Sequence, residues 1–162
     1  EGECAVKNTT LCYLLQGDEV LLLHRIKKKN DLNHDKWIGI GGHIEEGETP
    51  EMCIRREVLE ETGLTVGSLQ KAGIVDFHYD DVYERVYFFK SSDFSGTQIP
   101  CSEGIAEWIP KEKIADLNLW EGDRKFLPYL LSDEKLFFRM KLIYRADVLE
   151  KSELVSLEKE EG

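Results

Sequence analysis

Three glutamates near the middle of the chain have the spacing of a metal-binding group. Glu57, Glu60 and Glu61 occupy positions i, i+3 and i+4, so a helix would place their carboxylates on one face. Carboxylates on one face repel one another, but together they offer oxygen ligands to a hard divalent cation such as Mg²⁺. The alternative interpretation is an acidic helix face that is simply solvated.

The flanking residues predict the helix that carries these glutamates. Thr49 suits the N-cap and Pro50 the first helical position. Gly63 suits the position just after the last helical residue. Apolar residues lie on both sides of the acidic face, so we expect packing on both flanks: Ile54 and Val58 on one, Met52 and Leu59 on the other.

The segment before the helix suits ligand binding. Gly41 and Gly42 would let the backbone approach a ligand closely. Arg56 could pair with Glu48 and hold the intervening loop against the helix. These positions around the glutamates favour a catalytic site over an inert acidic surface.

The spacing of the whole segment resembles the signature of the Nudix hydrolase family. From Gly42 the chain reads five residues to Glu48, seven residues to Arg56-Glu57, then an aliphatic residue, one residue, Glu60-Glu61, one residue, and Gly63 followed by Leu64. Every fixed position of the family pattern is matched over residues 42–64.

The resemblance implies a mechanism and a set of ligands. Glu57, Glu60 and Glu61 would bind Mg²⁺, with Mn²⁺ as a substitute, and the main-chain carbonyl of Gly41 would add a ligand. The metal would activate water for attack on phosphorus. Glu60 and Glu103 are two candidates for the general base, and Glu103 also fits an ordinary exposed loop carboxylate.

Outside this segment the chain is similar to the MutT-homologue branch, the oxidised purine nucleoside triphosphatases. The similarity lies in residues 37–42 and in Trp120-Glu-Gly-Asp123, followed by Phe126 and Pro128. It implies that Trp120 stacks on the base and Asp123 hydrogen-bonds its edge, because a buried carboxylate discriminates between base edges. Trp120 also fits a core or lid aromatic.

Two positions depart from the branch pattern. Ile38 stands where the branch has a base-reading Asn, and Gly122 replaces one of two adjacent acids. Selectivity for oxidised purines such as 8-oxo-dGTP is therefore open. The loop over residues 27–36 carries several basic residues near the predicted pocket mouth. Arg25 or one of the lysines could contact the triphosphate, although a solubilising loop is the interpretation that we favour for them: Lys27, Lys28, Lys29 and Lys36.

Three functions follow as hypotheses. The first is Mg²⁺-dependent hydrolysis of a nucleoside triphosphate to the monophosphate and pyrophosphate. The second is a Nudix pyrophosphatase for ADP-ribose, a nucleotide sugar or dihydroneopterin triphosphate. The third is a non-catalytic ligand-sensing module, against which the intact glutamates argue.

Composition limits the partners. The net charge of −11 argues against a nucleic-acid polymer, but metal-binding carboxylates can still create a phosphate site. No apolar run reaches the length of a membrane span. The four cysteines match no zinc pattern, so we expect free thiols in a cytoplasmic protein, either monomeric or homodimeric.

The remaining pattern predicts a single Nudix domain over residues 1–162. Strands are expected over 9–16, 20–23, 37–42, 74–79, 85–90, 107–109 and 136–144, with a brief helix from Pro110 and a second main helix over 122–131. The charged tail from about residue 145 is expected to fray. Mixed strands with two main helices predict an α/β (α+β) sandwich around a mixed β-sheet.

Overall fold

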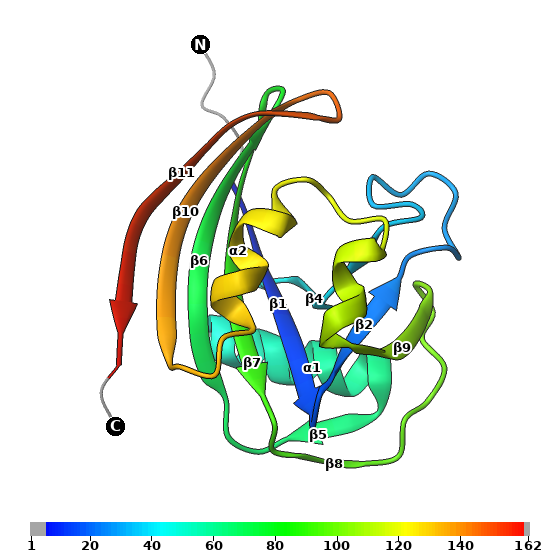
Figure 1. Cartoon of the computed structure of the whole chain (residues 1–162). Helices are drawn as coiled ribbons and strands as arrows, with labels where there is room; N and C mark the ends of the chain where they lie inside the picture. The colour runs from blue at the N-terminus through cyan, green and yellow to red at the C-terminus, as the bar shows by residue number, and fades with distance from the viewer. Residues whose placement is uncertain (1–5, 161–162) are drawn as a thin grey trace.

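The computed structural model describes residues 6–160, and a curved sheet runs through it with helices on both faces (Figure 1). The strands are β1 (Val6–Gln16), β2 (Glu19–His24), β3 (Trp37–Ile38), β4 (Ile40–His43), β5 (Leu64–Val66), β6 (Gln70–Tyr79), β7 (Val82–Ser91), β8 (Phe94–Gly96), β9 (Ile105–Pro110), β10 (Leu136–Arg145) and β11 (Val148–Lys159). The helices are α1 (Pro50–Thr62), the 3-10 helix η1 (Lys111–Asp116) and α2 (Asp123–Leu130).

The main sheet is mixed, as predicted. Its strand order is β11-β10-β6-β7-β1-β2-β3, with β4 paired to β1 and β9 paired to β2. β1 is parallel to β7 and β10 is parallel to β6, whereas the other pairs in this sheet are antiparallel. β5 and β8, which the sequence did not predict, form a separate antiparallel pair.

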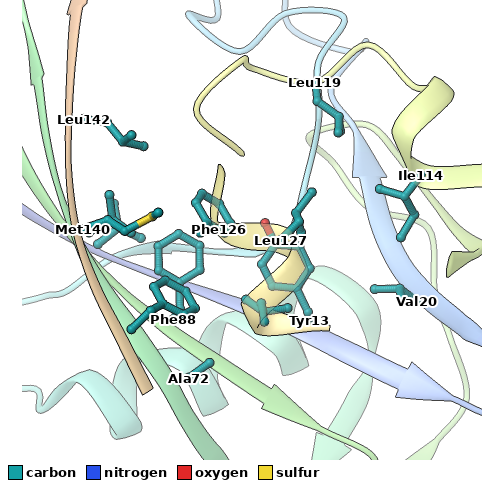
Figure 2. Packing of buried hydrophobic residues seen from close by; sticks show 14 of the residues in the cluster. Tyr13, Val20, Ala72, Phe88, Ile114, Leu119, Phe126, Leu127, Met140 and Leu142 are labelled. Atoms are coloured by element: carbon teal, nitrogen blue, oxygen red, sulfur yellow. The ribbon is translucent and has the colours of Figure 1, made fainter. Parts of the chain in front are cut away.

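Alternation along the central strands divides the core into two layers. Tyr13, Val20 and Leu22 belong to the layer that contains Phe126 of α2. Their neighbours in sequence, including Cys12 and Leu21, belong to the layer that contains Ile54 of α1. Because successive strand side chains point to opposite faces, one sheet supports both helices. Figure 2 shows Phe126 and Leu127 of α2 among Tyr13, Phe88 and Met140.

Helix α1 begins and ends where the sequence predicted. The Thr49 side chain accepts a hydrogen bond from the Met52 N–H, and Pro50 is the first residue of the helix. Gly63 adopts a left-handed conformation with φ 80° and donates its N–H to the Leu59 carbonyl. The prediction of packing on both flanks was wrong, because Met52 and Leu59 are 54% and 50% exposed.

The predicted strand over residues 37–42 is divided at Gly39. Ile38 pairs with Leu23 of β2, whereas Ile40 pairs with Cys12 of β1. A Cβ at Gly39 would lie 2.9 Å from the Tyr13 ring, so only glycine fits at the point where the chain changes partner. Gly41 and Gly42 consequently lie within β4.

The second main helix is shorter than predicted, spanning Asp123–Leu130, and Leu131 lies just beyond it. Its apolar side chains Phe126, Leu127 and Leu130 are all buried. Within residues 6–160, no helix is long and apolar enough to cross a membrane. Cys12, Cys53 and Cys101 are free thiols; Cys4 lies outside the described residues.

The prediction of a fraying tail from about residue 145 was wrong, because β11 pairs with β10 along its length. Leu149, Leu154 and Leu157 lie opposite the buried side chains of Tyr144, Met140 and Phe138. Two register shifts add one residue each to β11, which interrupts the two-residue alternation expected of a strand. The apolar residues of β11 therefore do not follow the alternating pattern by which a strand is recognised in a sequence.

Candidate active site

Arg56 organises the acidic end of the site. Its guanidinium binds both carboxylate oxygens of Glu48, at 2.6 Å (Nε–Oε2) and 3.0 Å (Nη2–Oε1), which confirms the predicted pair. The same group donates to Glu57 at 2.9 Å and to Glu60 at 3.3 Å. The bond to Arg56 lowers the pKa of Glu48 to about 2. One cation thus holds the loop before α1 and partly neutralises two of the three predicted metal ligands.

Glu57 lies where helix α1 meets strand β4. A Cβ at Gly42 would be 2.5 Å from the Glu57 carboxyl carbon and from Oε2, so glycine makes room for this side chain. Burial raises the pKa of Glu57, Arg56 opposes that rise, and the nearby charges of Glu60 and Glu61 add to it. A partly buried carboxylate with acidic neighbours is stabilised by additional positive charge.

Glu61 meets a residue that the sequence did not single out. The Cys101 thiol donates to Glu61 Oε2 at 2.7 Å, and Cys101 Sγ accepts the Glu103 N–H at 3.4 Å. Burial and the neighbouring carboxylate raise the pKa of Cys101 to about 11. The cysteine is thus a neutral hydrogen-bond donor to Glu61, and no spacing in the sequence indicated it because 40 residues separate the pair.

The three glutamates offer the hard oxygen donors that a divalent cation prefers. Among the side chains of residues 6–160, no three from His, Cys, Asp and Glu are gathered closely enough to hold a metal ion. The carboxylates are instead engaged with neighbours, Glu57 and Glu60 with Arg56 and Glu61 with Cys101. The donor chemistry fits a cation, and binding it requires these side chains to turn from their present partners.

Glu103 and Arg25 are paired with each other. Glu103 Oε1 lies 2.9 Å from Arg25 Nη2, and its Oε2 accepts from Lys28 Nζ at 2.9 Å. Arg25 also donates to Asp31 at 2.6 Å. Glu103 is therefore not a free surface carboxylate, and the guanidinium of Arg25 is already used to connect two loops.

The predicted base-stacking residue, Trp120, lies against the loop that follows β2. Its indole N–H donates to Asn33 Oδ1 at 2.7 Å. Lys36 Nζ lies 4.7 Å from the ring centroid, and Tyr144 packs edge-on with a centroid separation of 5.6 Å. The sequence identified Trp120 and Lys36 separately but did not predict their contact or the role of Asn33.

Asp123 is the first residue of α2 and is only 7% exposed. Burial raises the pKa of Asp123 to about 7, whereas the charges of Lys36 and Arg124 oppose the rise. A Cβ at the adjacent Gly122 would lie 2.5 Å from the Tyr144 hydroxyl and 2.7 Å from Leu142 Cδ1, so a larger residue requires these buried side chains to move. Tyr144 also accepts the Gly122 N–H at 2.6 Å, so the packing favours glycine at the position of the branch's second acid.

One short segment connects the two halves of the site. At its start, Lys36 lies beside Trp120, and the Trp37 N–H donates to the Asn118 carbonyl at 3.2 Å. At its end, Gly42 lies against the Glu57 carboxylate. Ile38, between them, pairs with Leu23 in the sheet and is only partly buried. The segment over residues 36–42 thus runs from the aromatic group, Trp120 and Tyr144, to the acidic group, Glu57, Glu60 and Glu61.

Comparisons with known proteins agree with this geometry. Residues 6–130 match the model of the NUDIX domain. The chain is 34% identical over 131 residues to an oxidized purine nucleoside triphosphate hydrolase of Danio rerio, covering 80% of this chain and 82% of that protein. The corresponding protein of Mus musculus is 35% identical over 128 residues, with 78% and 80% covered. Among solved structures, a MutT protein of Bacillus halodurans aligns with a TM-score of 0.75 and 28% identity over 94% of this chain and 97% of that one.

Proposed function

The chain belongs to the Nudix hydrolase family, and from that premise we propose that it hydrolyses a purine nucleoside triphosphate to the monophosphate and pyrophosphate with the help of Mg²⁺. The observation that supports this most directly is the segment over residues 36–42, which joins Trp120 at one end to Glu57 at the other. An aromatic platform and a carboxylate cluster connected in this way suit a ligand with a base at one end and phosphates at the other.

Glu57, Glu60 and Glu61 would hold the metal, together with the Gly41 carbonyl. A bound Mg²⁺ would lower the pKa of water and offset charge on the phosphate oxygens. Arg56 keeps α1, which carries the glutamates, and the preceding loop together through Glu48. Glu61 would exchange its hydrogen bond from the Cys101 thiol for the cation.

Between the two candidates for the general base, we favour Glu60. Glu103 is only 21% exposed, and its two carboxylate oxygens are occupied by contacts with Arg25 and Lys28, which leaves little room for a water molecule beside them. Glu60 is 57% exposed and has one cationic contact, at 3.3 Å from Arg56. It is therefore the freer carboxylate to accept a proton from water.

Trp120 would stack on the base, and Asp123 would bind its edge. A carboxylate accepts two hydrogen bonds from the N–H groups of a guanine edge, whereas its protonated form donates one and accepts one, as an adenine edge requires. Since burial brings the pKa of Asp123 to about 7, both forms are accessible near neutral pH. Two of the relatives are named as hydrolases of oxidized purine nucleoside triphosphates, which supports including oxidised bases among the substrates.

The test is turnover of a substrate panel with Mg²⁺: the unmodified deoxynucleoside triphosphates, 8-oxo-dGTP, 2-oxo-dATP, ADP-ribose and a nucleotide sugar. Pyrophosphate and phosphate are assayed separately. We expect a purine triphosphate to give the highest kcat/KM and to release pyrophosphate. If ADP-ribose or the nucleotide sugar gave a higher kcat/KM, that compound would be the better candidate for the substrate. If no compound were turned over, the proposed hydrolysis itself would be contradicted.

A further inference from the structure

Lys36 touches three consecutive residues of the segment that carries Trp120. Its ammonium lies 4.7 Å from the centroid of the Trp120 ring. It also donates to Asn118 Oδ1 at 3.2 Å and to the Leu119 carbonyl at 3.5 Å. A cation at this distance from an indole face is attracted by the ring quadrupole, so Lys36 helps to determine where the ring lies.

Other contacts of Trp120 complete a clamp around the ring. Asn33, from the same loop as Lys36, accepts the indole N–H at 2.7 Å. Tyr144 packs nearly perpendicular to the ring, with an interplanar angle of 79°. Among residues 6–160, Lys36 is the one cation over the Trp120 ring and Tyr144 the one aromatic side chain paired with it. The ring is thus oriented by its N–H, by Lys36 and by Tyr144.

Lys36 also acts on Asp123. The charge of Lys36 lowers the pKa of this carboxyl group and so opposes the effect of burial, and Arg124 acts in the same direction. Tyr13 and Tyr144 are the neighbouring titratable groups, and both keep their protons because burial raises the pKa of each. Lys36 therefore contributes to both residues that are proposed to recognise the base.

Two other lysines of the loop contact residues at the opposite end of the site. Lys27 donates to the Cys101 carbonyl at 2.7 Å, and Lys28 binds Glu103. Cys101 in turn contacts Glu61. The loop after β2 thus places two lysines toward the acidic group and Lys36 toward the aromatic group.

We propose that Lys36 is a positioning residue for the nucleobase and not a ligand of the triphosphate. It holds Trp120 by one face so that the base stacks on the other, and it supplies a positive charge on the strand side of the base site, where Ile38 provides no polar group. This inference rests on the proposed function, because it concerns how the same site selects its substrate.

The experiment compares Lys36→Met with Lys36→Arg, which keeps the cation, and with Lys29→Met, which removes an exposed lysine of the same loop. For the best purine triphosphate of the panel, we expect Lys36→Met to raise KM by about five- to tenfold, the range for loss of a partly desolvated cation–π contact. Its kcat should change less than twofold. Lys36→Arg and Lys29→Met should behave like the wild type.

Two probes separate the base from the phosphates. Binding of dGMP, measured by calorimetry, should weaken in Lys36→Met by the same factor as KM rises. Competitive inhibition by tripolyphosphate, which has no base, should be unchanged. If Lys36→Met weakened the binding of dGMP and of tripolyphosphate equally, the inference would be overturned, and Lys36 would be a phosphate ligand. An unchanged or lower KM would also overturn it, since Lys36 would then be only structural or would obstruct the base.

The wild type distinguishes failure of this inference from failure of the proposed function. If the wild type hydrolyses no triphosphate, the proposed function fails, and the dGMP measurement still decides the role of Lys36. Binding of dGMP that is lost in Lys36→Met and kept in Lys36→Arg supports the inference. A wild type that does not bind dGMP overturns it, because there is then no base site to position.

Discussion

The guanidinium of Arg56 shows how much one side chain contributes to the site. It binds Glu48 through two bonds and reaches both Glu57 and Glu60. Its charge reduces the repulsion among the glutamates, which would otherwise destabilise α1. Single residues of this kind determine whether a cluster of acids can exist in the folded protein before any ligand is bound.

At this scale the first prediction concerns Glu61. Replacing it by glutamine keeps a hydrogen-bond acceptor for Cys101 but removes a charged oxygen ligand. We expect Glu61→Gln to lower kcat/KM by at least about a hundredfold, since metal-assisted stabilisation of the transition state amounts to several kcal/mol. Steady-state kinetics over a range of Mg²⁺ concentrations measures the effect.

Glu46→Gln, at an exposed loop position, is the matched control and should retain wild-type activity. Equal activity of Glu61→Gln and the wild type would contradict a metal-binding role. A loss shared by both variants would show that net charge, and not the position of Glu61, is responsible.

The second prediction concerns Asp123, whose pKa rises from an ordinary 3.8 to about 7 because of burial. Between pH 3.8 and pH 7 the folded state keeps the Asp123 proton, whereas the unfolded state has released it. The contribution of this group to stability is therefore full below pH 3.8 and is lost as the pH rises through 7. Asp123→Asn removes that dependence. Its stability relative to the wild type should improve by roughly 2–4 kcal/mol between pH 4 and pH 8.

Urea denaturation of both proteins at several pH values measures this difference. Asp133→Asn, at a fully exposed position, is the control and should show no comparable trend. A difference between Asp123→Asn and the wild type that stays constant with pH would mean that Asp123 is ionised throughout.

At the scale of elements, two adjacent glycines of strand β4 allow it to pack closely against β1 on one hand and helix α1 on the other. A Cβ at Gly41 would lie 1.9 Å from the Thr10 carbonyl oxygen, which is backbone of β1. The three atoms nearest to a Cβ at Gly42 all belong to the Glu57 carboxyl group, at the end of its side chain. Neighbouring positions of one short strand therefore serve different purposes, close packing of strands and accommodation of a site residue.

This difference predicts separate outcomes for two alanine variants. Gly41→Ala should destabilise the protein by about 2–4 kcal/mol, because backbone must move to relieve the overlap. Gly42→Ala should keep most of the stability but displace Glu57, and we expect kcat/KM to fall at least about tenfold. Thermal denaturation and kinetics on both variants measure the two effects, and each variant is the control for the other.

Equal loss of stability in both variants would contradict this assignment, as would full activity of Gly42→Ala. The first result would mean that Glu57 cannot move aside. The second would mean that the position of its carboxylate does not matter for turnover.

At the scale of the whole molecule, the last strand completes the sheet. β11 covers β10 along one edge (Figure 1), with Leu154 opposite Met140 and Leu157 opposite Phe138. Without it, β10 would expose its backbone groups and part of the apolar face that supports α2. Since Asp123 begins α2, the edge of the sheet indirectly supports a residue that is proposed to bind the base.

Truncation after Arg145 tests this role. We expect the free energy of unfolding to fall by at least about 2 kcal/mol, because exposing on the order of 100 Å² of apolar surface costs that much. Urea denaturation measures it. The double variant Glu150→Gln and Glu158→Gln keeps the strand while reducing its charge, and it should unfold like the wild type. An unchanged midpoint for the truncated protein would show that β11 adds no stability.

The sequence by itself determined the features that depend on short spacing. Thr49, Pro50 and Gly63 predicted the limits of α1, and the positions of Arg56 and Glu48 predicted their ion pair. These interactions connect residues within a few turns of the chain, so local periodicity and capping rules contain them. The family, the hydrolase activity and the mixed sheet followed from the same stretch and from the alternation of the strands.

Only the tertiary structure decided the contacts between distant segments. Lys36 meets Trp120 across 84 positions of sequence, and Lys28 meets Glu103 across 75, so no local pattern encodes which lysine serves which end of the site. The break between β3 and β4 at Gly39 depends on the Tyr13 ring. The two register shifts interrupt the alternation of apolar residues in β11, so the sequence does not indicate this strand. In each case the residue's type was visible in the sequence, but its role was set by a partner that folding brought close.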